Sequence, residues 1–317
     1  MKRPVGRSTP SLVTRRDVVT GAIVIATAAA APNVAMSAQE TTAMLTRAIP
    51  STGEHLPVIG LGTWQTFDIG DNPAELAQRR EVLDVLFAAG GRVIDSSPMY
   101  GRAEAVTGKL IAAMSARDKA FIATKVWTSG KQAGIAQMQS SASKMSAPVV
   151  DLMQIHNLVD WRTHLDTLRA MKAAGTIRYI GVTHYTTSAF DDLASVLRTE
   201  PIDFLQIPYS LEQRAAETRL LPLAAEHRVA VIPNVPFGGG QMFAKVRGKP
   251  LPDWAADIEA KSFGQIFLKY LIAHPAVTCV IPGTAKPDHM RDNVGAGVGP
   301  LPDPAMRQRI AAWWAGL

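Results

Sequence analysis

From about residue 45 onward, short apolar runs alternate with longer segments whose apolar positions recur at helical spacing. The runs are almost continuously apolar, as expected for strands that are covered on both faces of a sheet. Two of the longer segments, 75–90 and 161–175, have the period of a helix and end at Gly90 and Gly175. Eight runs are predicted to be strands: 56–64, 92–97, 121–126, 151–157, 177–185, 203–210, 228–236 and 277–284.

This alternation predicts a fold in which strand and helix follow each other eight times. Eight such units over about 240 residues fit a (β/α)8 TIM barrel better than an open sheet. A Rossmann domain is disfavoured because no GxGxxG sequence follows the first predicted strand. We also expect a short hairpin at 44–56 that closes the barrel bottom, an irregular insertion at 237–260 and a C-terminal helix at 303–316.

The first 38 residues differ in composition from the rest of the chain. A basic start that includes Arg15 and Arg16 leads into the apolar stretch 21–31, and small residues follow up to Ala38. This order is typical of an export signal, and the adjacent arginines resemble a twin-arginine signal. The alternative interpretation is a disordered basic tail with an alanine-rich helix.

We therefore predict an export signal over 1–38 and a mature single domain over 39–317. The apolar stretch is shorter than the roughly 20 residues that a spanning helix needs, so no stable membrane span is expected in the mature protein. These expectations make the twin-arginine export machinery a partner of the chain. They place the protein in the bacterial periplasm.

The formal net charge of +6 comes mainly from the first 38 residues. Five basic residues there stand against one acidic residue, a net of +4, which leaves +2 for the remainder. The remainder is therefore too nearly neutral to suggest nucleic-acid binding. The one cysteine, Cys279, allows no intrachain disulfide, and its apolar surroundings favour a buried thiol. No Cys/His cluster has the spacing of metal ligands, so no metal site is predicted.

Four chemically active side chains come at the ends of three consecutive predicted strands. Asp95 and Tyr100 follow the second run, Lys125 ends the third, and His156 ends the fourth. In an α/β barrel these strand ends form the rim that carries the active site. Each residue alone has a structural explanation as a cap, a turn residue or an ion-pair partner. Together they favour a group that transfers a proton.

The chemistry of this group depends on the tyrosine. Tyrosine has a pKa near 10, and a neighbouring lysine ammonium is expected to lower it. An aspartate would hold the lysine in place, and a histidine would donate a hydrogen bond to a substrate oxygen. Such a set can protonate a carbonyl oxygen as charge develops on it, but the hydride must come from a nicotinamide.

Seven motifs follow one another along the chain: GLGTW at 60–64, VIDSSPMYG at 93–101, ATKVW at 123–127, QIHN at 154–157, RYIGVTHY at 178–185, LQIPYS at 205–210 and IPGTAKPDHMRDN at 281–293. In these motifs the sequence resembles the aldo/keto reductase superfamily, over about residues 45–297. The resemblance makes Tyr100 the general acid–base, with Lys125 tuning it, Asp95 pairing with Lys125 and His156 orienting the carbonyl. It also implies that Trp64 and Trp127 line the substrate pocket.

Two positions on the nicotinamide side depart from the family pattern. Where the family has Ser-Asn to hold the carboxamide, this chain has Thr183-His184, while Gln206 matches the family's glutamine. An aromatic residue commonly stacks on the nicotinamide just after the seventh strand. Asn234 stands at that position here, with Phe237 as the alternative.

The phosphate-binding motif is also altered. Thr284 and Asn293 are kept, but His289 stands at the usual arginine position and Gly283 at a position that is often lysine. Lys286 and Arg291 lie nearby, and the backbone amides of a helix that begins near 287 are expected to bind phosphate without a side chain. The resemblance implies NADPH as the cofactor, with NADH as the alternative.

The sequence thus predicts an NAD(P)H-dependent enzyme that reduces a small aldehyde or ketone to an alcohol. The cofactor would be bound by Thr183, His184, Gln206, Thr284, Lys286, His289 and Asn293. The alternative hypothesis is a nicotinamide-binding sensor or accessory scaffold with little turnover. The intact group of Asp95, Tyr100, Lys125 and His156 favours the enzyme, and the altered cofactor positions favour the sensor.

Overall fold

The computed structural model describes residues 43–317, and the predicted export signal at 1–38 lies outside them. Seven strands form one sheet in which every neighbouring pair is parallel and the strand order is the order along the chain. The strands are β3 (Leu61–Gly62), β4 (Val93–Asp95), β5 (Phe121–Val126), β6 (Val150–His156), β7 (Ile177–Thr183), β8 (Phe204–Pro208) and β9 (Ala230–Asn234).

The eighth predicted run closes the sheet into a barrel, but it does so without a continuous ladder. Val277 bridges to Val231 on one side, and Val280 bridges to Ile59 on the other, both in parallel register. Pro282 interrupts the run, since proline has no N–H with which to continue a ladder. The (β/α)8 barrel is therefore confirmed, while the prediction of a regular strand over 277–284 is wrong.

The first predicted run, 56–64, also divides in two. Its start, β2 (His55–Pro57), pairs in antiparallel fashion with β1 (Thr46–Ala48), which confirms the hairpin expected at the barrel bottom. The chain then passes close to β4 before β3 begins. A Cβ atom at Gly60 would lie 2.7 Å from the carbonyl oxygen of Val93, so only glycine fits at this point.

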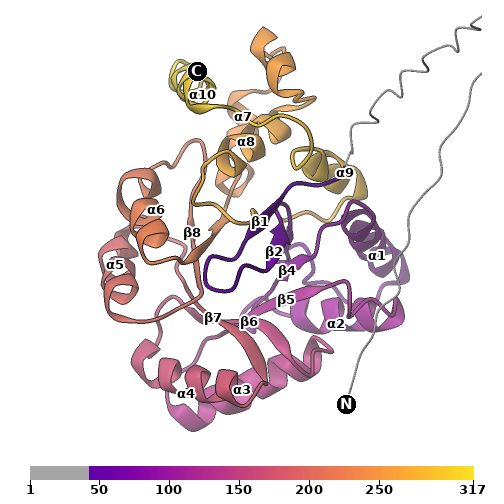
Figure 1. Cartoon of the computed structure of the whole chain (residues 1–317). Coiled ribbons are helices and arrows are strands. Elements are labelled where there is room, and N and C mark those ends of the chain that lie inside the picture. Colours follow the sequence, from indigo (N-terminus) through magenta and orange to yellow (C-terminus); the bar gives the residue numbers. More distant parts are fainter. Residues whose placement is uncertain (1–42) are drawn as a thin grey trace, which may run out of the picture. The chain divides into compact units, whose positions relative to one another are not determined.

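Helices connect successive strands and surround the sheet (Figure 1). The first helix begins at Pro73 because Asn72 caps it, its side-chain oxygen accepting from the backbone N–H groups of Ala74 and Glu75. The helices of the barrel are α1 (Pro73–Ala88), α2 (Ala103–Ala113), α3 (Lys131–Lys144), α4 (Trp161–Ala173), α5 (Phe190–Thr199), α6 (Ala216–Glu226), α8 (Phe263–Ile272) and α9 (Pro287–Gly295).

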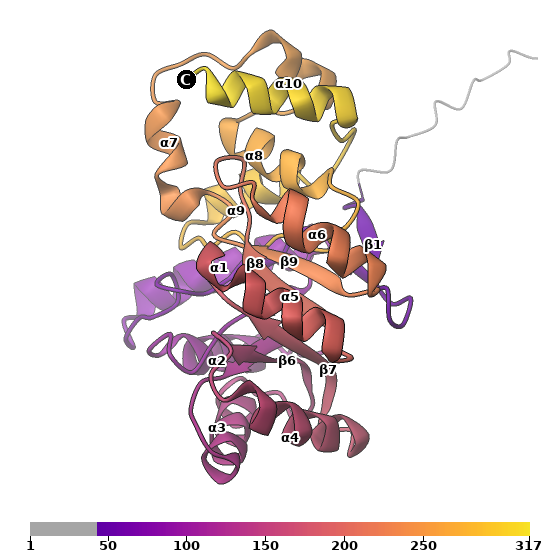
Figure 2. The same cartoon turned by 90° about the vertical axis from the view of Figure 1, so that its left-hand side faces the viewer.

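The remaining elements are short helices, together with one helix at the C-terminus. A 3-10 turn, η1 (Thr187–Ala189), precedes α5. The predicted insertion at 237–260 contains η2 (Gly238–Gly240), α7 (Met242–Lys245) and η3 (Asp253–Ile258). The predicted C-terminal helix is α10 (Pro304–Ala315), which Figure 2 shows beside α8. No helix within residues 43–317 is both long and apolar enough to cross a membrane.

Two groups of buried apolar residues make up the core. The larger group fills the space between the strands and the helices. The smaller group fills the barrel interior, with Phe121, Leu152 and Phe204 from the strands and Leu56 from the bottom hairpin. Cys279 belongs to this interior group, and burial raises the pKa of its thiol, as expected for an inert residue. The packed interior leaves the rim as the place for chemistry.

A polar cluster attaches α10 to the barrel. The Glu217 carboxylate on α6 accepts hydrogen bonds from the hydroxyl groups of Tyr209 (2.6 Å) and Tyr270 (2.8 Å), and from the Arg307 guanidinium (2.8 Å). Further along α10, Trp314 packs at a right angle against Phe267. One carboxylate oxygen therefore links α6, α8 and α10 with Tyr209, the residue that follows β8.

We predict that Glu217→Ala lowers the free energy of unfolding by about 2 kcal/mol, because it leaves three donors without their shared acceptor and the ion pair keeps some contact with solvent. Urea unfolding followed by circular dichroism measures the change. The matched control is Tyr270→Phe, which removes one of the three hydrogen bonds and should cost about 1 kcal/mol. An unchanged midpoint in Glu217→Ala would show that the cluster does not stabilise the fold.

Candidate active site

A buried ion pair lies at the centre of the rim. Lys125, at the end of β5, is fully buried, and its Nζ lies 2.6 Å from Asp95 Oδ2 at the end of β4. The same Nζ donates to the carbonyl oxygen of Ser96 at 2.7 Å. Adjacent parallel strands bring the two residues together because both strands end at this edge. The predicted pairing of Asp95 with Lys125 is present in the structure.

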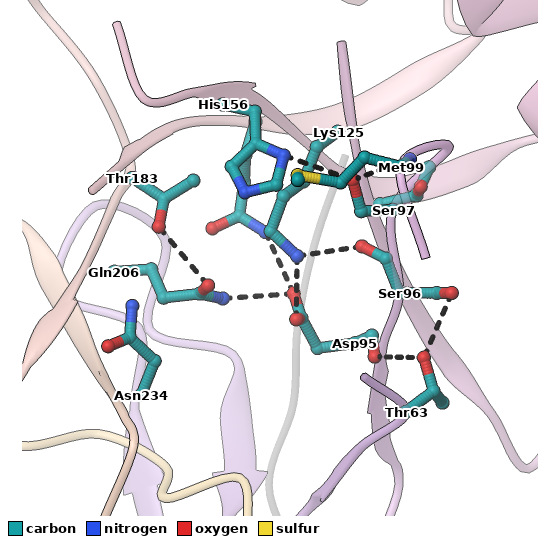
Figure 3. Close-up of polar contacts among 12 residues, drawn as sticks. Thr63, Asp95, Ser96, Ser97, Met99, Lys125, His156, Thr183, Gln206 and Asn234 are labelled. Carbon is teal, nitrogen blue, oxygen red and sulfur yellow. Dashed lines mark hydrogen bonds and ion pairs between the residues drawn. The ribbon is translucent and has the colours of Figure 1, made fainter. Parts of the chain in front are cut away.

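The second oxygen of Asp95 is held by two amides. Its Oδ1 accepts from Gln154 Nε2 at 3.0 Å and from Gln206 Nε2 at 2.9 Å. Thr183 Oγ1 in turn donates to Gln206 Oε1 at 3.2 Å. Figure 3 shows this chain running from Thr183 through Gln206 to Asp95 and Lys125. Side chains from β4, β5, β6, β7 and β8 thus form one network around a single carboxylate.

Tyr100 lies against the lysine of this network. Lys125 Nζ is 5.0 Å from the centre of the Tyr100 ring. Burial raises the pKa of Tyr100 above its ordinary value, Lys125 opposes the rise, and Asp95 adds to it. Lys125 therefore lowers the pKa of Tyr100, as expected, but desolvation of the phenolate outweighs this effect and the net direction is upward. Tyr100 is protonated at neutral pH and can donate that proton.

The ammonium of Lys125 remains charged despite its burial. Burial alone lowers the pKa of this group, but the attraction of Asp95 and Tyr100 outweighs the effect, and the net direction is upward. The proton-donating tyrosine therefore lies beside a permanent positive charge. A phenolate formed at Tyr100 would be stabilised by it.

His156, at the end of β6, lies across from Tyr100. The two rings meet edge to face, with 5.9 Å between their centres. Burial, with the positive charge of Lys125 and the nearby His184, lowers the pKa of His156 to about 3, so the imidazole is neutral. Ser97 Oγ accepts from the Met99 N–H and lies 3.0 Å from Nδ1 of His156. This arrangement favours a proton on Nε2, which can then donate to a substrate oxygen.

The predicted pocket residues lie at the surface of the rim. Trp64 follows β3 and is 53% exposed, and Trp127 follows β5 and is 43% exposed. The Trp127 ring centre is 6.5 Å from that of His156. Met99 is another exposed apolar residue on this rim. Trp127 therefore places a large apolar side chain next to the imidazole, and Trp64 and Met99 expose apolar surface beyond the ends of β3 and β4.

The altered residues on the nicotinamide side contact one another. Nδ1 of His184 accepts from the Thr186 N–H at 3.2 Å, and its ring stacks on Tyr185. Asn234 Nδ2 donates to the carbonyl oxygen of His184 at 3.1 Å, while Asn234 Oδ1 is buried and has no partner among the described residues. Figure 3 shows Asn234 beside Gln206.

Phe237, the alternative aromatic residue, belongs to a different group. Its ring centre lies 5.0 Å from that of Phe243 and 6.5 Å from that of Phe267. These contacts attach it to α7 and α8. The polar Asn234 therefore occupies the strand-end position where the family pattern expects an aromatic residue.

Three of the residues predicted to bind phosphate lie at or near the start of α9, and the fourth, Asn293, lies in the second half of this helix. Thr284 is buried, and its Oγ1 accepts from the Lys286 N–H at 3.0 Å. Asn293 is buried on α9, whereas Lys286 and His289 are exposed. Arg291 is engaged in ion pairs with Glu81 and Asp288 on the surface, at 2.6 and 2.7 Å. The loop 284–286 thus leads directly into a helix N-terminus.

The sequence did not identify Thr63, Ser97 and Gln154 as site residues. Gln154 carried a signal, since it is a polar amide between the apolar residues Met153 and Ile155 of the strand. Thr63 Oγ1 donates to the Asp95 backbone carbonyl and to Ser96 Oγ, both at 2.9 Å, and so fixes the end of β4. Residues 43–317 contain no group of three or more His, Cys, Asp or Glu side chains placed to hold a metal ion.

The chain resembles known proteins over most of its length. A family model described as "Aldo/keto reductase family" matches residues 58–312. YhdN, an aldo-keto reductase of Bacillus subtilis (strain 168), is 27% identical over 202 residues, or 58% of this chain and 59% of the relative, which is less than two thirds of its length. An aldo-keto reductase of Mycobacterium sp. (strain JLS) is 28% identical over 249 residues, or 76% of this chain and 83% of the relative.

The fold has a close counterpart among solved structures. An aldo-keto reductase from Klebsiella pneumoniae, crystallised in complex with NADPH, matches with a TM-score of 0.72 and 24% identity, over 86% of this chain and 96% of that one. At this identity the likeness concerns the fold alone. The family model, by contrast, spans nearly all of the barrel. The chain therefore belongs to the aldo/keto reductase family of oxidoreductases.

Proposed function

We propose that this protein reduces a small aldehyde or ketone to the alcohol, with NADPH as cofactor and Tyr100 as proton donor. The observation that carries the proposal is the buried Asp95–Lys125 pair, with Lys125 Nζ 5.0 Å from the centre of the Tyr100 ring. The NADPH of the Klebsiella relative supports the choice of cofactor. The exposed apolar rim at Trp64 and Trp127 supports a substrate with an apolar part.

The residues present fit a nicotinamide dinucleotide. On the nicotinamide side, Thr183, His184 and Gln206 supply polar groups at adjoining strand ends, and Asn234 Oδ1 is an acceptor still without a partner among the described residues. On the phosphate side, Thr284, Lys286 and His289 lie at or near the start of α9, and Asn293 lies in the second half of this helix. When bound, NADPH supplies a hydride from C4 of its nicotinamide to the carbonyl carbon.

The protein's own part in the reaction is to orient the carbonyl and to move one proton. Nε2–H of His156 donates a hydrogen bond to the carbonyl oxygen and directs it toward Tyr100. Tyr100 gives its proton to that oxygen as negative charge develops there. The ammonium of Lys125 stabilises the resulting phenolate, and Asp95 keeps the ammonium in place. Trp127 restricts access of water beside His156.

We predict that Tyr100→Phe lowers kcat for reduction of a small aldehyde by roughly 10²- to 10⁴-fold, because it removes the proton donor and keeps the ring. The dissociation constant of NADPH should stay within about twofold of wild type, since the change preserves the shape of the site. Stopped-flow oxidation of protein-bound NADPH measures the first quantity, and fluorescence titration the second. Equal rates in both proteins would exclude Tyr100 as donor. If the wild-type protein binds NADPH but no carbonyl compound oxidises the bound NADPH, the sensor hypothesis would be favoured.

The pH dependence follows from the directions of the two pKa shifts. Because the pKa of Tyr100 is raised, the acid form persists through neutral pH and is lost only in the alkaline range. Because the pKa of His156 is lowered to about 3, the imidazole stays neutral above that value. We predict that kcat/KM for reduction is flat from about pH 6 to 9 and falls at higher pH. A change in kcat/KM with a midpoint near pH 6.5 that is present in the wild type and absent in His156→Gln would contradict a neutral His156.

For the leader, we infer that residues 1–38 are a twin-arginine export signal and that residues 39–317 are a single mature domain of the bacterial periplasm. The order of basic, apolar and small residues supports this inference. We predict that Arg15→Lys with Arg16→Lys abolishes export of a reporter fused after residue 38, because both arginines are part of the recognised signal. Replacement of Lys2 and Arg3 by glutamine, which removes two positive charges but keeps Arg15 and Arg16, serves as the control and should leave export intact. Export by the double lysine variant would refute the assignment.

A further inference from the structure

Arg79, in the middle of α1, is a buried cation outside the network around Asp95. The residue is only 7% exposed. Its Nε donates to the carbonyl oxygen of Thr66 at 2.6 Å, and its Nη1 donates to the side chain of Gln78 and to the carbonyl oxygen of Ala285 at 3.4 Å. The guanidinium therefore lies between the loop that follows β3 and the loop that leads into α9.

The positive charge of Arg79 has no counter-ion in the described chain. Among residues 43–317, no carboxylate forms an ion pair with it, and Glu75 acts only from a distance. Burial lowers the pKa of the guanidinium, which reflects the cost of holding this charge away from water. A buried charge with only neutral partners is unusual, and an anion beside it would offset the cost.

One nitrogen of this guanidinium remains available. Nε and Nη1 are engaged as described above, but Nη2 makes no hydrogen bond within residues 43–317. Nη2 is also not completely buried, so solvent can reach it. Nη2 can therefore donate to a group that enters from solvent.

The N-terminus of α9 directly follows the loop that this guanidinium contacts through Nη1. Ala285, which accepts from Arg79, is followed by Lys286, the residue before the first turn of the nine-residue helix. No side chain caps the helix, and in the described structure the backbone N–H groups of Asp288 and His289 have no acceptor. Two free amides at a helix N-terminus favour an anion, and the guanidinium beside them adds a full positive charge.

Acidic groups in the neighbourhood do not oppose an anion here. Glu81, on the exposed side of α1, and Asp288, in the first turn of α9, both pair with Arg291. Lys286 is exposed at the start of the helix and adds a further positive charge. Arg79 and Lys286 are therefore two cations at the loop 284–286 without an ion-pair partner among the described residues, while Glu75 on α1 acts on Arg79 from a distance.

We propose that Arg79 binds the 2′-phosphate of NADPH and sets the preference of this protein for NADPH over NADH. The proposal rests on the proposed function. The phosphate motif of this chain has Gly283 and His289 where the family often has lysine and usually has arginine. The proposal assigns the missing positive charge to Arg79 on α1. Nη2 of Arg79 and the amides of Asp288 and His289 supply the donors, and the phosphate supplies the missing negative charge. The bridging diphosphate of the cofactor has the same chemistry, so the experiment must separate the two groups.

The experiment compares ligands with and without the 2′-phosphate. Dissociation constants are measured for NADPH and NADH by fluorescence titration, and for adenosine 2′,5′-bisphosphate and adenosine 5′-monophosphate by calorimetry. We expect Arg79→Met to raise the dissociation constants of NADPH and of the bisphosphate by about 10- to 100-fold, because a charge-assisted hydrogen bond is lost. NADH and the monophosphate, which lack the group, should change less than about twofold. Arg79→Lys keeps the positive charge but loses the planar, multi-donor guanidinium. Its dissociation constants for NADPH and the bisphosphate should lie between those of the wild type and those of Arg79→Met.

The matched control is Arg80→Met, which changes the next residue of α1, an exposed arginine that pairs with Asp84. It should leave all four dissociation constants unchanged. Equal losses for NADPH and NADH in Arg79→Met would assign the diphosphate or a purely structural role to Arg79 and overturn the proposal.

The wild-type protein provides a test that needs no variant. We expect it to bind NADPH at least about 10-fold more tightly than NADH. Equal affinities would overturn the proposal even if Arg79→Met does not fold, and they would leave the reductase function intact. Binding of neither dinucleotide would overturn both the role of Arg79 and the proposed function.

Discussion

The ion pair between Asp95 and Lys125 is the constraint on which the rest of the site depends. A lysine and an aspartate with almost no exposed surface are stable only if both charges are close and their remaining hydrogen-bonding capacity is used. Here one oxygen of the Asp95 carboxylate accepts a hydrogen bond from the Lys125 ammonium. The other oxygen accepts from the side-chain amides of Gln154 and Gln206. The barrel satisfies this demand because its parallel strands all end at the same rim.

The same burial decides the protonation states of the proposed catalytic groups. Desolvation raises the pKa of Tyr100 and lowers that of His156, so both side chains are neutral at the pH of ordinary function. A positive Lys125 beside Tyr100 favours the phenolate once the proton has left. The tyrosine is thus a proton donor in the resting site, and the lysine acts chiefly on the state that follows.

The cofactor side is built on the same strand ends with different residues. Thr183 keeps the hydroxyl that reaches Gln206, which joins this side to the carboxylate of Asp95. His184 and Asn234 contact each other through a backbone carbonyl, and Phe237 packs away toward α7 and α8. At the other end, positive charge that is missing from the phosphate motif is present on α1, at Arg79. Departures from a family pattern within one element can therefore be compensated from an element far away in the sequence.

The sequence by itself determined the alternation of strands and helices, and with it the barrel and the rim positions of Asp95, Tyr100, Lys125 and His156. These follow from local apolar periodicity, which needs no knowledge of distant contacts. Only the tertiary structure decided how the barrel closes at 277–283, that Gln154 holds the carboxylate, and that the pKa of Tyr100 rises. It alone placed the guanidinium of Arg79 beside a loop some 200 residues later. Burial and hydrogen bonding between elements far apart in the chain set these properties, and neither can be predicted from the local periodicity of apolar residues.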